Sequence, residues 1–152
     1  MVRLRRTTYR DTDFQNLIAQ LDTELRKRYY MIQEDYEHHN KVDEIQTVVV
    51  AYDEELAVGC GCFKEFGNKT VEIKRMYVVP SSRGKGISKL ILCEVEKWAM
   101  EKGYEYAVLE TGDKQEQAVS LYTSSGYKRT ENYRQYIDMT HSWCFKKKLE
   151  IN

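Results

Sequence analysis

A short glycine-rich segment, Arg83-Gly84-Lys85-Gly86, follows an extended β-branched run that ends at Pro80. A helical pattern begins directly after it, at Ile87. A strand, a glycine-rich turn and a helix in this order leave backbone N–H groups unpaired, and the helix adds the positive end of its dipole. Such a turn forms a site for an anion, and this arrangement favours a pyrophosphate. The sequence therefore indicates a phosphate-bearing cofactor and the place where it binds.

The spacing of the glycines excludes two common phosphate-binding motifs. A P-loop requires two glycines five residues apart followed by Lys and Ser or Thr, and this chain lacks that spacing. A dinucleotide-binding fingerprint requires a third glycine where Lys89 stands, although Gly84 and Gly86 match the first two. A nucleotide-binding module with an unrelated glycine-rich turn is an alternative, which tight binding of ATP without binding of coenzyme A would support.

The elements around the turn follow a strand–helix–strand–helix order. Residues 71–79 form an extended run, and apolar residues recur at helical spacing over 87–99, with Gly103 as a stop signal. A second strand is predicted over 106–109, followed by a short helix that includes residues 118–122. This order predicts two strands whose connecting helix carries the glycine-rich turn at its start.

The remaining segments predict further strands and two helices before the turn. Asp11 is placed to cap a helix over 12–21, and a second helix is predicted over 22–38. The predicted strands are 2–8, 47–52, 56–63, 127–129 and 143–149. We therefore predict one α/β domain, residues 1–152, with a mixed, mostly antiparallel sheet flanked by helices.

The composition restricts the partners of the chain. Lys plus Arg and Asp plus Glu both number 24, so the formal net charge is +0 and gives no general attraction to nucleic acid or to an anionic membrane. No apolar run approaches the length of a membrane span, and no signal peptide is expected. Four cysteines in no zinc or disulfide pattern favour reduced thiols in a cytoplasmic protein, and no metal site is predicted at His38-His39.

The turn and the second helix resemble motifs A and B of the GNAT superfamily of acetyl-CoA-dependent N-acetyltransferases. Motif A is Arg/Gln-x-x-Gly-x-Gly/Ala, and Arg83, Gly86 and Ser88 fall on its fixed positions. Ser88 departs from the usual Gly or Ala, but as the next smallest residue it keeps the close approach of the pyrophosphate, with a less snug fit. The segment Leu121-Tyr122-x-x-x-Gly126-Tyr127 resembles motif B. The resemblance covers roughly residues 45–149 and implies the GNAT fold.

The resemblance implies acetyl-CoA as co-substrate and assigns the residues that bind it. The strand before Pro80 splays from its neighbour in this family and pairs with the pantetheine arm, so Met76 and Val78 would contact the arm through their backbones. The pyrophosphate would be held by the turn and the first helical residues, namely Arg83, Gly84, Lys85, Gly86, Ile87, Ser88 and Lys89.

Acetyl transfer from a thioester to an amine requires an acid for the departing thiolate and a base for the amine. By resemblance Tyr122 is the acid, because many GNAT enzymes place a tyrosine there facing the cofactor sulfur; the alternative is a core tyrosine. Glu72 is the candidate base, four residues before Met76 and hence on the same face of a regular strand. The alternative for Glu72 is a surface charge paired with Lys74.

Glu110 is the competing base, and Thr111 is placed to donate a hydrogen bond to cofactor or substrate. The acceptor groove of this fold would include Tyr29 and Tyr133, and tyrosines with nearby acids favour a cationic amine. We therefore predict an N-acetyltransferase that acts on a primary amine of a small molecule or peptide by direct attack in a ternary complex. The alternative is a non-catalytic acyl-CoA-binding or sensing domain. Analogy with other GNAT proteins also suggests that the chain forms a homodimer.

Overall fold

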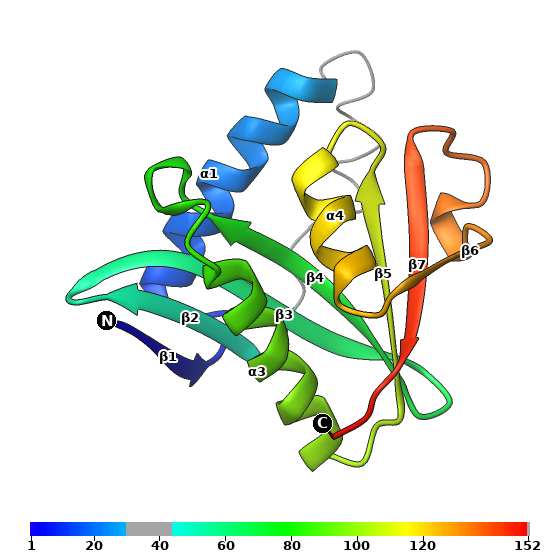
Figure 1. The fold of residues 1–152 in the computed structure, drawn as a ribbon, viewed down its shortest axis with the longest axis horizontal. Coiled ribbons are helices and arrows are strands. Elements are labelled where there is room, and N and C mark those ends of the chain that lie inside the picture. Colours follow the sequence, from blue (N-terminus) through cyan, green and yellow to red (C-terminus); the bar gives the residue numbers. More distant parts are fainter. Residues whose placement is uncertain (30–43, 152) are drawn as a thin grey trace.

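The computed structural model describes residues 1–29 and 44–151, which form a seven-stranded sheet and its helices (Figure 1). The sheet order is β1-β2-β3-β4-β5-β7-β6, and β4 and β5 are its parallel pair. In chain order the elements are β1 (Val2–Thr7), α1 (Thr12–Tyr29), β2 (Val48–Asp53), β3 (Leu56–Gly67), β4 (Thr70–Val78), η2 (Pro80–Ser82), α3 (Ile87–Glu101), β5 (Tyr106–Gly112), α4 (Glu116–Ser124), β6 (Lys128–Thr130), η3 (Arg134–Tyr136) and β7 (Ser142–Lys148). The predicted mixed, mostly antiparallel sheet flanked by helices is confirmed.

Two apolar cores lie on opposite faces of the sheet, because side chains alternate along each strand. On β2, Val49 and Ala51 belong to the core beneath α3, whereas Val48 and Val50 belong to the core beneath α1. Helix α4 shares the face of α3, where Tyr122 joins the core. Figure 1 shows α3 and α4 together in front of the sheet. The sheet is therefore covered on both sides, with the first helix opposite the other two.

The N-terminal segment forms one helix where the sequence predicted two. Asp11 caps it as expected, since its Oδ1 accepts the N–H of Phe14 at 3.1 Å. The predicted break between Leu21 and Asp22 is wrong, because α1 continues to Tyr29. Asp22 does not begin a helix. Its carboxylate instead accepts a hydrogen bond from Arg75 Nη1 at 2.6 Å. The predicted helical residues after Tyr29 lie outside the described part of the chain.

A β-bulge in β4 changes which side chains share a face. Cys60 pairs with Tyr77 and Cys62 pairs with Lys74, so two residues of β4 oppose one residue of β3. Arg75 occupies the extra position with a φ of 59°. Beyond the bulge, Met76 packs into the α3 core, whereas Glu72 lies on the opposite face from its core neighbours in β4. The predicted common face for Glu72 and Met76 is therefore wrong.

Strands β4 and β5 separate halfway along their length. Their ladder joins residues 70–73 to residues 106–109, but β4 continues to Val78 and β5 continues to Gly112. Figure 1 shows the two strands diverging toward the end of the sheet that carries the glycine-rich turn. The unpaired ends leave backbone groups of both strands facing a gap in the middle of the sheet.

Two glycines of β3 differ in how tightly their backbones are packed, which gives a test of the fold. A Cβ at Gly59 would lie 2.9 Å from the Tyr77 carbonyl oxygen and 2.9 Å from Ile91 Cδ1, and the backbone oxygen cannot move away cheaply. We expect Gly59→Ala to lower the free energy of unfolding by about 1–3 kcal/mol, measured by thermal or urea denaturation. Gly67→Ala is the control, because its Cβ meets only Arg134 Nη2 at 3.7 Å. Equal stability of the two variants would contradict this packing.

Within the described residues, no helix is long and apolar enough to cross a membrane. Cys60, Cys62, Cys93 and Cys144 are all free thiols. In the same part of the chain, no group of three or more His, Cys, Asp or Glu side chains is placed to hold a metal ion. His38 and His39 lie outside the described residues.

Candidate active site

A cleft of about 710 Å³ opens where β4 and β5 separate. It is lined by residues 73–78 of β4, by the end of β5, by the glycine-rich turn with the start of α3, and by α4. Residues of α1 line it from the other face of the sheet. Most of the predicted site therefore comes together in one cavity, with the anion-binding turn at one part and buried ionisable side chains at another.

The glycine-rich turn leads directly into α3. Gly84 and Gly86 have φ values of 79° and 78°, a conformation that favours glycine, and a Cβ at either would meet no atom within 4 Å. The glycines are thus required by backbone conformation and not by lack of space. No side chain caps α3 at Gly86. Its first N–H groups, which have no intrahelical partners, are available to an anion together with the helix dipole.

The predicted phosphate-binding residues line the cleft with one exception. Gly84, Gly86, Ile87, Ser88 and Lys89 are among its lining residues. Lys85 is exposed and is not among them. The Ile87 side chain is 2% exposed and belongs to the α3 core, so only its backbone is left to face an anion.

Arg83 lies at the cleft, but its guanidinium is occupied by the protein. Nε donates to the Val78 carbonyl oxygen at 2.9 Å, and Nη1 and Nη2 donate to Glu24 at 3.0 and 2.7 Å. All three guanidinium nitrogens therefore have protein partners, and the predicted contact of Arg83 with the phosphate stays a prediction. The position of Arg83 ties the turn to the end of β4 and to α1.

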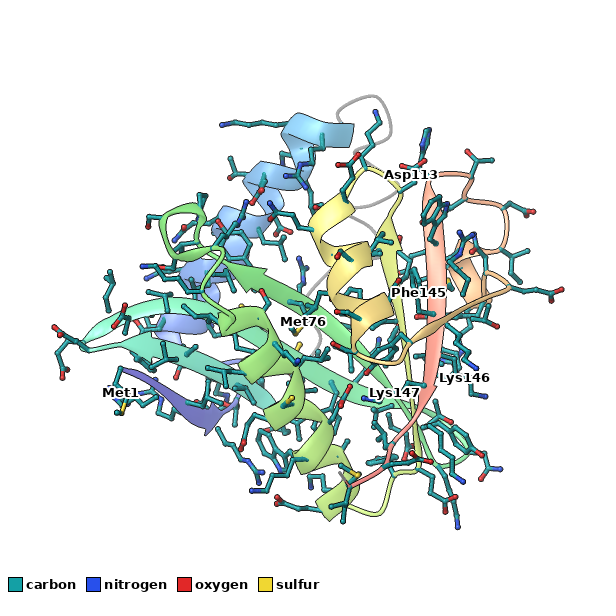
Figure 2. All side chains as sticks on the ribbon, in the orientation of Figure 1. Met1, Met76, Asp113, Phe145, Lys146 and Lys147 are labelled. Carbon is teal, nitrogen blue, oxygen red and sulfur yellow. The ribbon has the colours of Figure 1, made fainter. Side chains whose placement is uncertain are left out.

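Met76 and Val78 both line the cleft, on the part of β4 that is not paired with β5. Figure 2 shows Met76 near the centre of the molecule, beside α3, and its side chain packs against the α3 core. The contact of an extended ligand arm with these residues would thus be through their backbones. The Val78 carbonyl oxygen already accepts Arg83, which leaves its N–H for such a contact.

Tyr122 projects from α4 into the core and also lines the cleft. Its ring packs against Tyr127 and Phe145, with centroids 5.8 and 6.4 Å apart, and the residue is 5% exposed. Burial, with a smaller contribution from the charge of Glu110, raises the pKa of the Tyr122 hydroxyl. The hydroxyl therefore stays protonated and can act as a donor throughout the physiological pH range. Tyr122 is thus a core tyrosine that also reaches the cleft, and its role as the acid stays a prediction.

Glu110 lines the cleft at the end of β5, and its carboxyl is poised to exchange a proton. Burial raises its pKa to about 7, the Glu72 charge adds to the rise, and the Ser142 hydroxyl opposes it by donating to Oε2 at 2.6 Å. A carboxyl with a pKa near neutrality is an effective general base. Thr111, the next residue, is 8% exposed and also lines the cleft.

Glu72 and Tyr133 are close to the cleft but do not line it. The Tyr133 hydroxyl donates to Glu72 Oε2 at 2.7 Å, and Glu72 is 3% exposed. The Tyr133 ring packs against Phe66 and Tyr136, with centroids 4.8 and 5.6 Å apart. Glu72 is thus a buried partner of Tyr133, neither the predicted surface charge nor a group at the cleft wall. Tyr29 ends α1, and its side chain lies outside the described part of the structure.

Glu24 and Gln115 also line the cleft together with Arg28, and the sequence pattern did not single out Glu24 or Gln115 as part of a site. Glu24 lies 59 positions before Arg83, and Arg28 lies 87 positions before its partner Gln115. No local spacing signals contacts at such separations. A helical projection does show that Glu24 and Arg28 are four residues apart and therefore neighbours on α1.

The comparisons with known proteins agree with this geometry. The model of the acetyltransferase (GNAT) family matches residues 9–127. An uncharacterized N-acetyltransferase of Schizosaccharomyces pombe is 41% identical over 88 residues, which are 57% of this chain and 54% of that protein. YsnE, an uncharacterized N-acetyltransferase of Bacillus subtilis, is 35% identical over 101 residues, or 65% of this chain and 67% of that one. The chain thus spans about half of the yeast relative and two thirds of the bacterial one.

Solved structures share the fold over nearly the whole chain. A Klebsiella pneumoniae protein assigned as an acyl-CoA N-acyltransferase superposes with a TM-score of 0.82 at 26% identity, covering 99% of both chains. A GNAT family acetyltransferase from Elizabethkingia anophelis, solved with acetyl-CoA bound, superposes with a TM-score of 0.70 at 18% identity, covering 97% of this chain and 98% of that one. The predicted GNAT fold is confirmed.

Proposed function

Because this chain belongs to the acetyltransferase (GNAT) family, we propose that it transfers the acetyl group of acetyl-CoA to a primary amine of a small molecule or peptide. The amine attacks directly in a ternary complex. The observation that carries the proposal is the cleft between the diverging strands β4 and β5, which joins an anion-binding turn to the ionisable groups Glu110 and Tyr122. Acetyl-CoA has a pyrophosphate, an extended amide-bearing arm and a thioester, in an order that matches this arrangement.

The residues of the cleft fit the binding of acetyl-CoA. The N–H groups of the turn and of the first turn of α3 receive the pyrophosphate. The edge of β4 that β5 leaves open, around Met76 and Val78, binds the pantetheine arm as it would bind an added strand. The thioester then lies beside Tyr122, beyond the end of the arm.

Two side chains divide the proton transfers. Glu110, with a pKa of about 7, accepts the proton that the amine loses as the new C–N bond forms. Tyr122 donates a hydrogen bond and then a proton to the sulfur as the C–S bond breaks. We assign the role of base to Glu110 in preference to Glu72, since Glu110 lines the cleft and Glu72 does not. Burial is the main cause of the raised pKa of Glu110, and the charge of Glu72 adds to the rise.

The acceptor approaches from the α1 side of the sheet, where Leu21 and Leu25 line the cleft together with Lys74. Burial lowers the pKa of Lys74, and the charge of Glu72 opposes this shift. A wall with apolar, acidic and basic groups suits an amine that carries apolar substituents. Thr111 offers a hydroxyl to the acceptor or to the acetyl group at the same place.

The thermal unfolding of the protein with acetyl-CoA tests the cofactor site. A ligand present at 100 times its Kd adds about 2.7 kcal/mol to the stability of the folded state. We expect acetyl-CoA and CoA to raise the Tm of the wild type, and Gly86→Asp to abolish this rise, because the new carboxylate occupies and repels the anion site. ATP alone should give no comparable shift.

The control is Gly103→Asp at the other end of α3. Gly103 also has a positive φ, 93°, and its Cβ would meet no atom within 4 Å. The two variants thus carry the same change in similar backbone conformations, but only Gly86 is at the cleft. No shift of the wild type with acetyl-CoA, or a shift that survives in Gly86→Asp, would refute the proposed site.

A further inference from the structure

The carboxylate of Glu24 holds three elements of the cleft together. Its two oxygens accept hydrogen bonds from Nη1 and Nη2 of Arg83, and Oε1 also accepts one from Arg28 Nη2 at 3.2 Å. Arg28 in turn donates to Gln115, the residue that precedes α4. We call these four side chains the clasp. All four line the cleft, so the clasp joins the glycine-rich turn, α1 and the start of α4 at its wall.

The clasp fixes the orientation of Arg83. All three guanidinium nitrogens donate to protein oxygens, and the group lies 5.6 Å from the centroid of the Tyr77 ring. A planar guanidinium in a fork–fork pair has a defined geometry as well as a strong hydrogen bond. Because Arg83 is part of the turn, this geometry also fixes the backbone that leads to Gly84 and Gly86.

We propose that Glu24 is a positioning residue for acetyl-CoA: by holding Arg83 against the Val78 carbonyl, it keeps the turn in the conformation that receives the pyrophosphate. This inference rests on the proposed use of acetyl-CoA. Glu24 does not touch the ligand in this role; it reduces the conformational freedom that the turn would lose on binding. Arg83 lowers the pKa of Glu24, so the carboxylate stays charged at neutral pH.

The charge balance of the clasp supports this role. An Arg83 side chain without a partner would be a flexible cation beside the turn. Paired with Glu24 it is neutralised, and the attraction for the pyrophosphate is left to the fixed N–H groups of the backbone and to the helix dipole. Figure 1 shows the turn between β4 and α3 lying beside α1, as this pairing requires.

The test is the Kd of acetyl-CoA, measured by isothermal titration calorimetry on the wild type, Glu24→Ala, Arg83→Ala and the double variant. Glu94→Ala is the matched control, since Glu94 is paired with Arg6 at 2.7 Å and its side chain is 24% exposed, against 22% for Glu24. We expect Glu24→Ala to raise the Kd about tenfold while the Tm without ligand stays within about 2 °C of the wild type, as for a partly exposed ion pair. The isosteric Glu24→Gln decides the matter if Glu24→Ala does not fold.

The double variant separates positioning from a merely structural effect. If Glu24 acts through Arg83, the double variant binds acetyl-CoA no more weakly than Arg83→Ala alone. The proposal would be overturned if the increases in Kd caused by the two single substitutions multiplied in the double variant. A Kd of Glu24→Ala within twofold of the wild type, or an equal rise of the Kd in Glu94→Ala, would also overturn it. Failure of the wild type to bind acetyl-CoA would instead overturn the proposed function, and this inference with it.

Discussion

Replacing Tyr122 with phenylalanine is expected to lower kcat by about a hundredfold or more while leaving the Kd of acetyl-CoA within about threefold, in line with the loss of a general acid. The substitution removes the hydroxyl and keeps the ring that packs against Tyr127 and Phe145. Release of CoA from acetyl-CoA, followed with a thiol reagent and an amine found by screening, measures kcat. The departing sulfur then leaves without a proton donor beside it, which is the physical reason for the loss.

Tyr127→Phe is the control for this experiment. Its ring lies next to Tyr122, but its hydroxyl donates to Glu96 Oε2 at 2.7 Å and the residue is not at the cleft. We expect this variant to lose about 1 kcal/mol of stability from the buried hydrogen bond and to keep its kcat. Unchanged turnover in Tyr122→Phe would refute the acid role. Binding of acetyl-CoA by the wild type without turnover of any amine would favour a non-catalytic acyl-CoA-binding domain.

The rate at limiting acceptor concentration is expected to rise with pH through the pKa of Glu110, about 7. Below this value the carboxyl is protonated and cannot take a proton from the amine, so kcat/KM falls about tenfold for each unit of pH. We expect Glu110→Gln to abolish this fall of kcat/KM at low pH and to lower the value of kcat/KM at high pH by about a hundredfold or more. Measurement of kcat/KM from pH 5 to pH 9 checks both effects.

Glu110→Gln is expected to lower activity but to raise the stability of the folded protein relative to the wild type at high pH. The folded pKa of Glu110, about 7, lies above its usual value of 4.5, so the folded protein holds this proton more tightly than the unfolded chain. The contribution of this group to stability is present below pH 4.5 and is lost as pH rises toward 7. Glu110→Gln has no such loss and should therefore be more stable relative to the wild type at pH 8 than at pH 4.5.

Glu72→Gln tests Glu72 as the other candidate base. If the fall of kcat/KM at low pH were lost in Glu72→Gln and kept in Glu110→Gln, Glu72 would be the base.

The parts of the site that were predicted from the sequence are those with local signals. Gly84 and Gly86 stand between a strand and a helix, where a positive φ and free N–H groups follow from the residue type and the order of elements. Tyr122 is assigned through the resemblance of its segment to a GNAT motif, and it lies at the cleft. The strands and helices were predicted from the alternation and the helical spacing of apolar residues, and the mixed sheet flanked by helices from their order along the chain.

The parts that were missed depend on contacts between distant segments. The bulge at Arg75 reverses the alternation of β4, and an arginine carries no signal for a φ of 59°. Asp22 was taken as the start of a new helix, yet its carboxylate pairs with that same Arg75, 53 positions away. Whether Glu110 or Glu72 reaches the cleft is also decided by the separation of β4 from β5, which no single segment encodes.

The separation of β4 from β5 has a consequence for the protein before it binds a ligand. Strand edges with free N–H and C=O groups pair readily with any extended chain, and most proteins protect them with bulges, charges or a covering loop. Here two such edges face each other in the middle of the sheet, and Figure 2 shows Met76 near the centre of the molecule. β-Augmentation by a peptide, or by a second copy of the chain, would use the same backbone groups as the pantetheine arm. A ligand with an extended, amide-bearing arm would thus complete a sheet that the polypeptide leaves open, and we expect its binding to reduce self-association through these edges.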